Sequence, residues 1–347
     1  MQSGTIGVVV IGTGGIGRYH LELWRETSGV EIVGVYDRDR EVATRAAKET
    51  GVKRIYDSLE EALNEPCADA IDICTPNRSH RELVIAALEA GKHCLCEKPL
   101  AVTPAEIEQM IAARDRSGKL LMTAQHMRFE QRSVALKRII DQGELGRIYH
   151  ARAWWLRRRR APTSPGLLTR AQAAYGPGLD LGVHMLDLAL HYMDFPQPVS
   201  VSGIAVRELA LQSDVANEWG VYQPEDFEVE DFAAAMIRFE TGAALSLEVS
   251  WLLNMREQED CQLWLHGTSG GAHWPEVELN GVIGGSLFNT RVITSDGGDG
   301  HRNELAAFRD AIASDGPSPV PAEQSLAVAR ILEGLYVSAE AGSEIRI

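Results

Sequence analysis

The chain has 347 residues, which is enough for two domains, since one compact domain usually holds about 100–200. Apolar residues make up 45% and charged residues 24%, as is ordinary for a soluble globular protein. The net charge of −15 disfavours nucleic acid and anionic membranes as partners, because both bind basic surfaces. No apolar run reaches the roughly 20 residues that span a bilayer, and no secretory signal is evident, so we expect a cytoplasmic protein.

The five cysteines predict neither a metal site nor a disulfide framework. None of them forms a C-x-x-C pair, which is the usual spacing of zinc ligands. Cys94 and Cys96 alternate within one predicted strand and should point to opposite faces. We therefore expect small buried side chains in a reducing compartment, and no bound metal.

The first part of the chain alternates strands and helices. The expected strands are 5–12, 31–37, 69–75, 93–97 and 120–125, and the expected helices are 14–27, 41–50, 81–90 and 104–117. Thr103 and Glu106 have the spacing of a capping box, with Pro104 at the first helical position. Strands that alternate with helices predict a doubly wound parallel sheet, here a dinucleotide-binding domain of residues 1–125.

The pattern changes after about residue 125. Extended runs are expected at 148–157, 199–206, 232–239, 243–251 and 262–266, and helices at 133–141, 179–193, 303–313 and 323–341. Thr241-Gly242 predicts a hairpin turn, and Asn280-Gly281 predicts one more strongly. Residues 126–347 should therefore form an α+β domain on a large, mostly antiparallel open sheet.

A glycine-rich segment follows the first strand and opens the first helix. It reads Gly12-Thr13-Gly14-Gly15-Ile16-Gly17 and fits the G-x-G-x-x-G fingerprint of dinucleotide-binding proteins. The three fingerprint glycines permit a tight turn, close approach of the pyrophosphate and close packing of the helix, in that order. The N-terminus of the helix then offers N–H groups to the phosphates. This context predicts a dinucleotide site.

Asp37, at the end of the second strand, indicates which dinucleotide is bound. It lies 20 residues beyond Gly17, where a carboxylate can accept hydrogen bonds from the adenosine ribose. The same charge would repel the 2′-phosphate of NADP, which favours NAD. Arg38 could partly offset this repulsion, so use of both NAD and NADP stays open.

Three later motifs, together with the fingerprint, resemble the Gfo/Idh/MocA oxidoreductases, the family of glucose–fructose oxidoreductase and inositol dehydrogenase. The motifs are Thr75-Pro76-Asn77-x-x-His80, Glu97-Lys98-Pro99-Leu100 and Gly178-x-Asp180-x-Gly182-x-His184-x-x-Asp187. The resemblance covers essentially the whole chain. It implies a Rossmann domain, a second domain with an open sheet that forms a homodimer or homotetramer, and an active site between the domains.

The resemblance assigns catalytic roles to three residues. Lys98 corresponds to the lysine of the Glu-Lys-Pro motif, whose ammonium would stabilise the developing alkoxide. Its peptide bond to Pro99 is expected to be cis, as in relatives. His184 would take the hydroxyl proton as the hydride leaves carbon, and Asp180, four residues earlier on the same helix face, would orient the substrate or assist His184. His191 lies farther along this helix and is expected outside the site.

Further contacts are assigned around the cofactor and the substrate. The resemblance places Thr75, Pro76 and Asn77 at the nicotinamide end of the cofactor site. His80 and Glu97 are further candidates for cofactor contact, although a local structural role is the simpler expectation for His80. His126 and Arg128 are candidate substrate contacts in the segment that enters the second domain.

The run from Arg157 to Arg160 is unexpected in an acidic chain. A solvated loop is one reading, and substrate contact through Arg158 or a neighbour is the other, because guanidinium groups bind hydroxyl and anionic groups. Trp154 and Trp155 precede this run on a strand and should point to opposite faces. Either could stack on a sugar ring, although packing against the sheet is the simpler role.

The leading hypothesis is an NAD-dependent dehydrogenase that acts on a ring hydroxyl of a sugar, glycoside or cyclitol. Some family members instead oxidise a sugar transiently, eliminate the aglycone and return the hydride, which makes them redox-neutral hydrolases. The motifs do not separate these two reactions. A dinucleotide sensor without catalysis is a third hypothesis, which the presence of Lys98, Asp180 and His184 disfavours.

Overall fold

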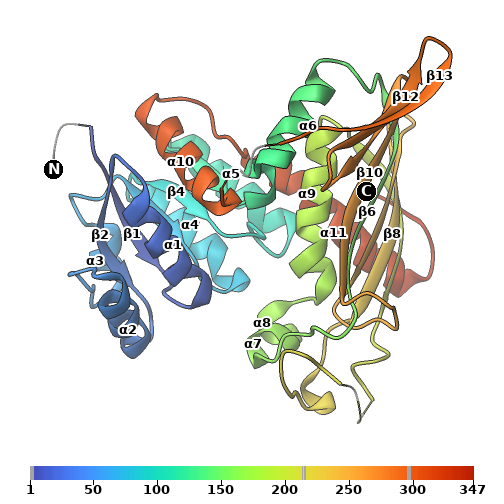
Figure 1. Ribbon diagram of the computed structural model, residues 1–347. Coiled ribbons are helices and arrows are strands. Elements are labelled where there is room, and N and C mark those ends of the chain that lie inside the picture. Colours follow the sequence, from blue (N-terminus) through green and yellow to red (C-terminus); the bar gives the residue numbers. More distant parts are fainter. Residues whose placement is uncertain (1–3, 213, 215, 295–297) are drawn as a thin grey trace. The chain divides into compact units, whose positions relative to one another are not determined.

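The computed structural model describes residues 4–212, 214, 216–294 and 298–347 (Figure 1). The chain divides into two compact units, Met1–Phe129 with Gly298–Leu326, and Glu130–Gly297 with Ala327–Ile347. The sequence pattern places everything after residue 125 in the second domain. In this division, the first unit continues to Phe129 and also includes residues 298–326. Among the described residues, no helix is both long and apolar enough to cross a membrane.

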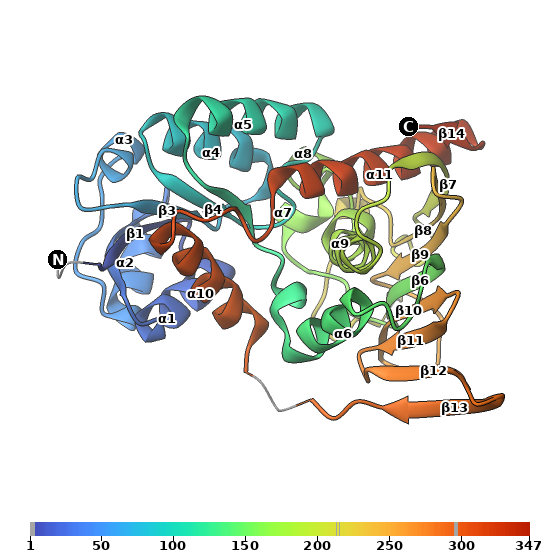
Figure 2. The ribbon, with the colours of Figure 1, turned by 90° about the horizontal axis from the view of Figure 1, so that it is seen from above.

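The first unit contains the predicted parallel sheet. Its strands are β1 (Ile6–Ile11), β2 (Val30–Tyr36), β3 (Ala70–Ile73), β4 (His93–Cys96) and β5 (Leu121–Thr123), in the order β2-β1-β3-β4-β5. The helices are α1 (Gly15–Glu26), α2 (Arg40–Thr50), α3 (Leu59–Leu63), α4 (His80–Glu89), α5 (Pro104–Ser117) and α10 (Gly300–Ala313). In Figure 2, α4 and α5 lie on one face of the sheet, and α1 and α10 lie on the other. The doubly wound fold is thereby confirmed.

Local sequence signals explain several boundaries in this unit. Thr103 and Glu106 form the predicted capping box at the start of α5. α2 ends where Gly51 adopts a φ of 78°, a left-handed conformation that costs glycine little. α10 belongs to this unit because Leu305 and Phe308 are buried in its hydrophobic core, against residues of β1 and α1.

The second unit is built on a nine-stranded sheet. Its strands are β6 (Ile148–Arg157), β7 (Pro198–Val206), β8 (Phe232–Phe239), β9 (Ala244–Ser250), β10 (Glu259–Gly267), β11 (Gly270–Trp274), β12 (Glu278–Ile283), β13 (Ser286–Arg291) and β14 (Ile345–Arg346). The order is β13-β12-β11-β10-β6-β9-β8-β7-β14, and every pair is antiparallel except β6 with β9. The expected open, mostly antiparallel sheet is confirmed.

Helices lie against one face of this sheet. They include α6 (Gln131–Asp141), α9 (Val183–Tyr192) and α11 (Ala322–Ala341), and Figure 2 shows all three on the same side. The short helices α7 (Pro165–Leu168) and α8 (Arg170–Ala173) precede α9. The cross-strand partners of Trp155 are Cys261 and Val249, and the Cys261 thiol contacts Met185 of α9. Trp155 therefore points to the helix-covered face and Trp154 to the other, as predicted.

The two predicted turns had different outcomes. Thr241-Gly242 joins β8 to β9, and Gly242 has a φ of 79°, which confirms the hairpin. The turn predicted at Asn280-Gly281 is wrong, because both residues lie within β12 and pair with Asn289 and Phe288. The hairpin turns instead at Gly284 and Gly285, both with positive φ. A glycine suits position 281 of this strand, because a Cβ there would come within 2.8 Å of the Phe288 ring.

Candidate active site

The predicted cofactor motifs all follow carboxyl ends of parallel strands in the first unit. The glycine-rich segment follows β1, Asp37 follows β2, Thr75 follows β3 and Lys98 follows β4. Because the strands are parallel, these ends share one edge of the sheet. The chain leaves β1 and β3 toward opposite sides of the sheet, and this switch point is where open α/β sheets bind ligands.

The geometry of the glycine-rich turn fits a dinucleotide. Gly12 has a φ of 86°, and a Cβ on Gly17 would lie 1.9 Å from the carbonyl oxygen of Gly12, so both positions require glycine. A Cβ on Gly14 would meet no atom within 4 Å, which leaves room beside the backbone. Gly14 is the N-cap of α1 and offers no side chain to the first N–H groups. These groups are suited to hold a pyrophosphate.

Asp37 is held at this turn by Thr13 of the glycine-rich segment. Its carboxylate accepts hydrogen bonds from the backbone N–H of Thr13, at 2.8 Å, and from the Thr13 hydroxyl, at 3.2 Å. Arg38 is exposed beside it. The carboxylate thus has a fixed place next to the glycine-rich segment, as a ribose contact needs.

We expect Asp37→Ser to shift the cofactor preference from NAD toward NADP. The change removes the charge that repels a 2′-phosphate and leaves Arg38 to attract it, so the ratio of NADPH to NADH affinity should rise about 100-fold. Fluorescence titrations of the protein with each reduced cofactor measure this ratio. In the double variant with Arg38→Ala, most of the gain should disappear. An unchanged ratio in the single variant would contradict the assignment of Asp37.

The loops after β3 and β4 are tied together by His80. The ring of His80 is fully buried, with Nδ1 2.9 Å from the carbonyl oxygen of Pro99 and Nε2 2.7 Å from that of Thr75. Burial lowers the pKa of this histidine. We therefore favour the structural alternative for His80, which fixes the two loops, over direct cofactor contact.

Lys98 lies at the turn after β4, and its peptide bond to Pro99 is cis, as expected. Its backbone N–H donates a 3.0 Å hydrogen bond to the Glu97 carboxylate, which is buried. Glu97 therefore binds the backbone of the predicted catalytic lysine, a role that the sequence alone does not reveal.

The segment after β5 places His126 against a histidine that the sequence analysis missed. The rings of His126 and His301 stack with centroids 3.8 Å apart, and His301 lies in the first turn of α10. Burial and the nearby charge of His301 lower the pKa of His126 to about 3. Arg128 is buried and donates to Gln324 at 2.6 Å, so it joins this segment to residues 298–326 of the same unit. Substrate contact by either residue stays a prediction.

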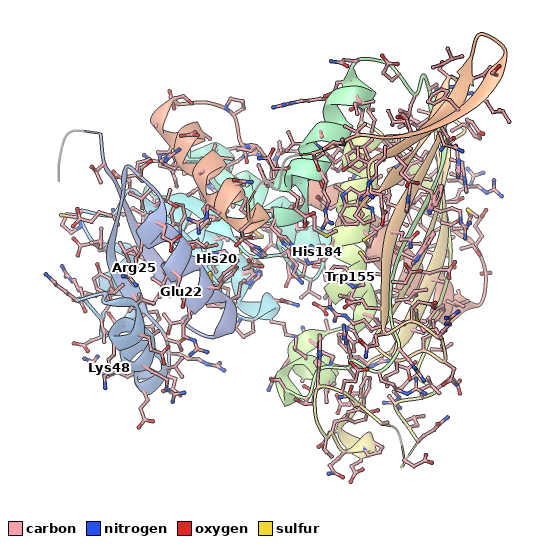
Figure 3. The ribbon with its side chains drawn as sticks, in the orientation of Figure 1. His20, Glu22, Arg25, Lys48, Trp155 and His184 are labelled. Carbon is pink, nitrogen blue, oxygen red and sulfur yellow. The ribbon has the colours of Figure 1, made fainter. Side chains whose placement is uncertain are left out.

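The second unit holds Asp180 and His184 at the start of its central helix. The single helix predicted over 179–193 begins instead with a π-helical turn, Gly178–Gly182, followed by α9. Such turns are frequent at functional sites. Asp180 accepts a 3.1 Å hydrogen bond from the Trp251 indole, and the buried His184 ring lies 5.8 Å from that of Trp155 (Figure 3). A tryptophan of β6 and another directly after β9 thus lie beside the predicted base and its partner.

A buried carboxyl group fixes the π-helical turn. Glu230 accepts hydrogen bonds from the backbone N–H groups of Gly176 and Gly178, at 2.9 and 3.2 Å, and from the Tyr336 hydroxyl, at 2.7 Å. A Cβ on Gly178 would lie 2.2 Å from that hydroxyl, which explains the glycine that opens the third motif. Burial raises the pKa of Glu230.

Replacing Glu230 by Ala should therefore lower the free energy of unfolding by about 3–5 kcal/mol, because two N–H groups and a hydroxyl lose their buried acceptor. Urea unfolding measures the change. Glu225→Ala is the matched control, since Glu225 is exposed nearby and should change the free energy by less than about 0.5 kcal/mol. Equal midpoints for the two variants would show that Glu230 does not hold this turn.

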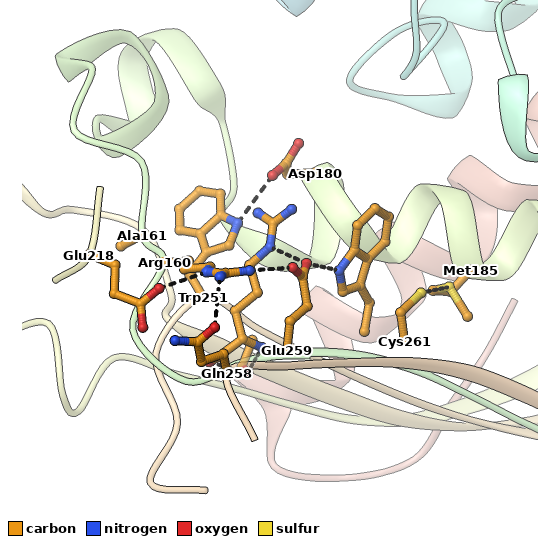
Figure 4. Close-up of polar contacts among 12 residues, drawn as sticks. Arg160, Ala161, Asp180, Met185, Glu218, Trp251, Gln258, Glu259 and Cys261 are labelled. Carbon is orange, nitrogen blue, oxygen red and sulfur yellow. Dashed lines mark hydrogen bonds and ion pairs between the residues drawn. The ribbon is translucent and has the colours of Figure 1, made fainter. Parts of the chain in front are cut away.

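The arginine run is organised by a carboxylate from a neighbouring strand. Glu259 accepts hydrogen bonds from the Trp155 indole and from Arg157 and Arg160, at 2.6, 3.0 and 2.7 Å (Figure 4). Arg160 also pairs with Glu218 at 2.9 Å. These two arginines therefore hold the end of β6 in place. A fully solvated loop, which was one of the two expectations for this run, does not describe them. Glu259 lies about 100 residues along the chain, and no local pattern indicates the pairing.

The middle of this run is different. Arg158 is exposed, and its guanidinium reaches the carbonyl oxygen of Arg256 at 3.4 Å. Arg159 donates to the carbonyl oxygen of Leu253 at 2.9 Å and to the side chain of Asn254 at 2.5 Å. Of the two, Arg158 is the better candidate for a substrate contact.

Two family models match most of the chain. Residues 6–125 match the oxidoreductase family with an NAD-binding Rossmann fold, and residues 133–273 match the GFO/IDH/MocA C-terminal domain. The chain belongs to the Gfo/Idh/MocA family. The family resemblance drawn from the motifs is thus confirmed, and this family member is an NAD-dependent oxidoreductase.

Individual relatives agree with this membership. The chain is 30% identical to the D-glucoside 3-dehydrogenase of Escherichia coli (strain K12), over 100% of this chain and 99% of the relative. It is 27% identical to the inositol 2-dehydrogenase of Salmonella paratyphi B (strain ATCC BAA-1250 / SPB7), over 83% and 80% of the two chains. A levoglucosan dehydrogenase solved with NADH and levoglucosan has a TM-score of 0.85 at 23% identity, with 99% of each chain covered, and shows the shared fold.

Proposed function

We propose that this protein uses NAD to oxidise a ring hydroxyl of a sugar, glycoside or cyclitol. The observation that supports this most directly is the match to a D-glucoside 3-dehydrogenase over the full length of both chains. A match of this extent includes the regions of both motifs, Glu-Lys-Pro and Asp-x-x-x-His. A glucoside is therefore the first substrate class to test.

The proposed chemistry divides among three side chains. Bound NAD would supply the carbon that accepts the hydride. Lys98 would donate a hydrogen bond to the reacting oxygen and stabilise its negative charge as the proton leaves. His184 would remove that proton, and Asp180, held by Trp251, would orient the substrate or the imidazole. The face of Trp155 near His184 would suit the C–H groups of a sugar ring.

We also propose that the uncovered face of the nine-stranded sheet joins copies of this chain into a homodimer or homotetramer. The face is defined by cross-strand neighbours on β7, β8, β6 and β10, including Ile204, Met236, Trp154 and Trp264. Ile204 and Met236 are 53% and 38% exposed. A broad surface with large apolar side chains is typical of a subunit interface.

The proposed activity can be tested with a substrate panel. Purified protein would be mixed with NAD and with methyl β-D-glucoside, levoglucosan, free sugars or inositols, and nicotinamide absorbance would be followed while products are identified by mass spectrometry. Sustained NADH formation with a ketone product supports the dehydrogenase. Aglycone release from a glycoside without net NADH would establish the redox-neutral hydrolase instead. Neither product from any compound would overturn the proposed substrate class.

A further inference from the structure

A row of buried ionisable groups lies behind Lys98 in the first unit. His20 of α1 is 0% exposed, with Nδ1 3.0 Å from an Asp72 carboxylate oxygen and Nε2 3.2 Å from Oε1 of Glu97. The other oxygen of Glu97 accepts the backbone N–H of Lys98. The row therefore runs without a gap from β3, through α1, to the backbone of the Glu-Lys-Pro turn. Figure 3 labels His20 on α1.

The two carboxylates beside His20 favour a charged ring. Nδ1 is hydrogen-bonded to Asp72, and Nε2 lies at ion-pair distance from Glu97 without hydrogen-bond geometry, so an imidazolium is attracted to a carboxylate on each side. Burial would lower the pKa of His20, but the charge of Asp72 and its hydrogen bond to the ring outweigh burial and raise the pKa well above its usual value. In Glu97, burial is likewise outweighed by His20 and the charge of Lys98, which lower the pKa to about 2.

Asp72 is fixed independently of His20. The Trp24 indole donates a 2.8 Å hydrogen bond to the Asp72 oxygen that faces His20. Both Trp24 and Asp72 are buried, so this end of the row is anchored in the core. The other end is the turn that presents Lys98, and the imidazolium joins the two.

We propose that His20 is a positioning residue for Lys98, a buried imidazolium that keeps Glu97 ionised and thereby fixes the backbone from which the lysine extends. The inference rests on the catalytic role proposed for Lys98. It assigns a function to the third residue after the last glycine of the fingerprint, a position that neither the fingerprint nor the Glu-Lys-Pro motif includes. It also explains why the motif has a glutamate before its lysine.

A metal site is the alternative reading of the same cluster. The candidate ligand atoms of His20, Asp72 and Cys74 lie within 4.8 Å of one another, and among the described residues this is the one group of its kind. Metals bind the thiolate, however, and burial raises the pKa of the Cys74 thiol. Asp72 is already bound by Trp24, and the second nitrogen of His20 faces Glu97. The arrangement suits hydrogen bonds rather than a metal ion.

The remaining titratable groups around His20 come from α10 and from the segment after β5, where burial lowers the pKa of His126 to about 3. The His301 ring lies 6.3 Å from that of His20, and burial together with the charge of His20 lowers its pKa. Glu304 is fully buried, and burial with the nearby negative charge of Glu97 raises its pKa well above the usual range. These shifts favour the neutral forms of His126, His301 and Glu304, which leaves His20 as the buried cation of the row.

The charge state of His20 can be measured without a substrate. In protein labelled with ¹⁵N-histidine, the His20 signals are assigned as those lost in His20→Gln. We expect both ring nitrogens to give protonated-type shifts that do not change between about pH 6 and 9. A neutral ring, or one that titrates near pH 6.5 as an ordinary histidine does, would overturn the proposal even if no substrate had been found.

The positioning role is tested by the pH dependence of turnover with methyl β-D-glucoside. In His20→Gln, burial of Glu97 is no longer opposed by a cation, so its pKa should rise. Below the raised pKa, Glu97 is protonated and no longer acts as a carboxylate. We therefore expect kcat of the variant to fall about tenfold per pH unit below that pKa, so that the fall begins at a higher pH than in the unmodified protein. The added Glu97→Gln change should abolish this additional acid limb, because the carboxyl that titrates is gone and only the pH dependence of His184 remains.

The matched control is His93→Gln, at the opposite end of β4, where the ring accepts a hydrogen bond from the backbone of Leu120. Its pH profile should stay that of the unmodified protein, and NADH affinity should remain within about threefold in all variants, which confirms folding. If His20→Gln lowered kcat equally at every pH, His20 would have only a general structural role and the proposal would fail. Absence of glucoside turnover in the unmodified protein would count against the proposed substrate and leave the NMR result to decide the role of His20.

Discussion

Replacing Lys98 by Met should lower kcat for the oxidised sugar about 10²–10³-fold while leaving the affinity for NADH within about threefold. Methionine matches the length of most of the lysine stem but has no donor for the reacting oxygen, and losing one such donor typically costs this much. The backbone N–H of residue 98 would still bind Glu97, so the turn should keep its conformation. Initial rates at saturating substrate and a fluorescence titration with NADH measure the two quantities.

The control for this variant is Lys119→Met. Lys119 lies just before β5, at the amino-terminal edge of the same sheet, whereas Lys98 follows the carboxyl end of β4. Its removal should change kcat by less than about twofold. If the Lys98 variant kept a kcat within twofold of the unmodified protein, the lysine would not be the oxyanion donor, and the mechanism proposed for this chain would be wrong.

His184→Asn is the second change with a large expected effect, a fall in kcat of about 10²–10⁴-fold, which is the usual contribution of a general base. Asparagine retains a polar group of similar size but cannot accept the proton. The unmodified protein should oxidise its substrate faster as pH rises through the titration of the base, since only neutral imidazole can accept a proton. The reverse reduction needs the imidazolium and should slow over the same range. Both limbs should vanish in the variant.

His191→Asn is the matched control, because His191 lies on the same helix two turns beyond His184. It should retain both pH limbs and most of the activity. Loss of the limbs in this variant, with their persistence in His184→Asn, would move the proton acceptor to His191. Persistence in both variants would exclude either histidine as the base.

Local sequence was sufficient for the first sheet and for its cofactor. The strands of the first unit are short apolar runs, each followed by a turn and a helix signal, and this order alone restricts the topology to a doubly wound sheet. Gly12 and Gly17 could be assigned to backbone roles because each requirement, a positive φ or a close approach, arises within a few residues. Asp37 could be found by its distance along one βαβ unit.

The second sheet was predicted less completely. β6 and β8 are long alternating strands with clear signals, and their bounds match those expected. β11, β12 and β13 have weak alternation and several glycines, and Asn280-Gly281 has the composition of a turn. Pairing with β11 and β13 keeps these two residues extended, because each edge of β12 gains ladder hydrogen bonds that a turn would lose.

What the sequence by itself determined is therefore the family and the NAD-binding fold, and it also named the candidate catalytic residues, such as Lys98 and His184. Only the tertiary structure decided which groups hold them. His20 contacts Glu97, Glu230 binds the turn at Gly178, and Glu259 binds Arg157, across separations of 52 to 102 residues. Buried charges and N–H groups must find partners, but any nearby carboxylate satisfies that need. The packing of whole helices and strands determines which carboxylate becomes the partner, and no local sequence pattern predicts it.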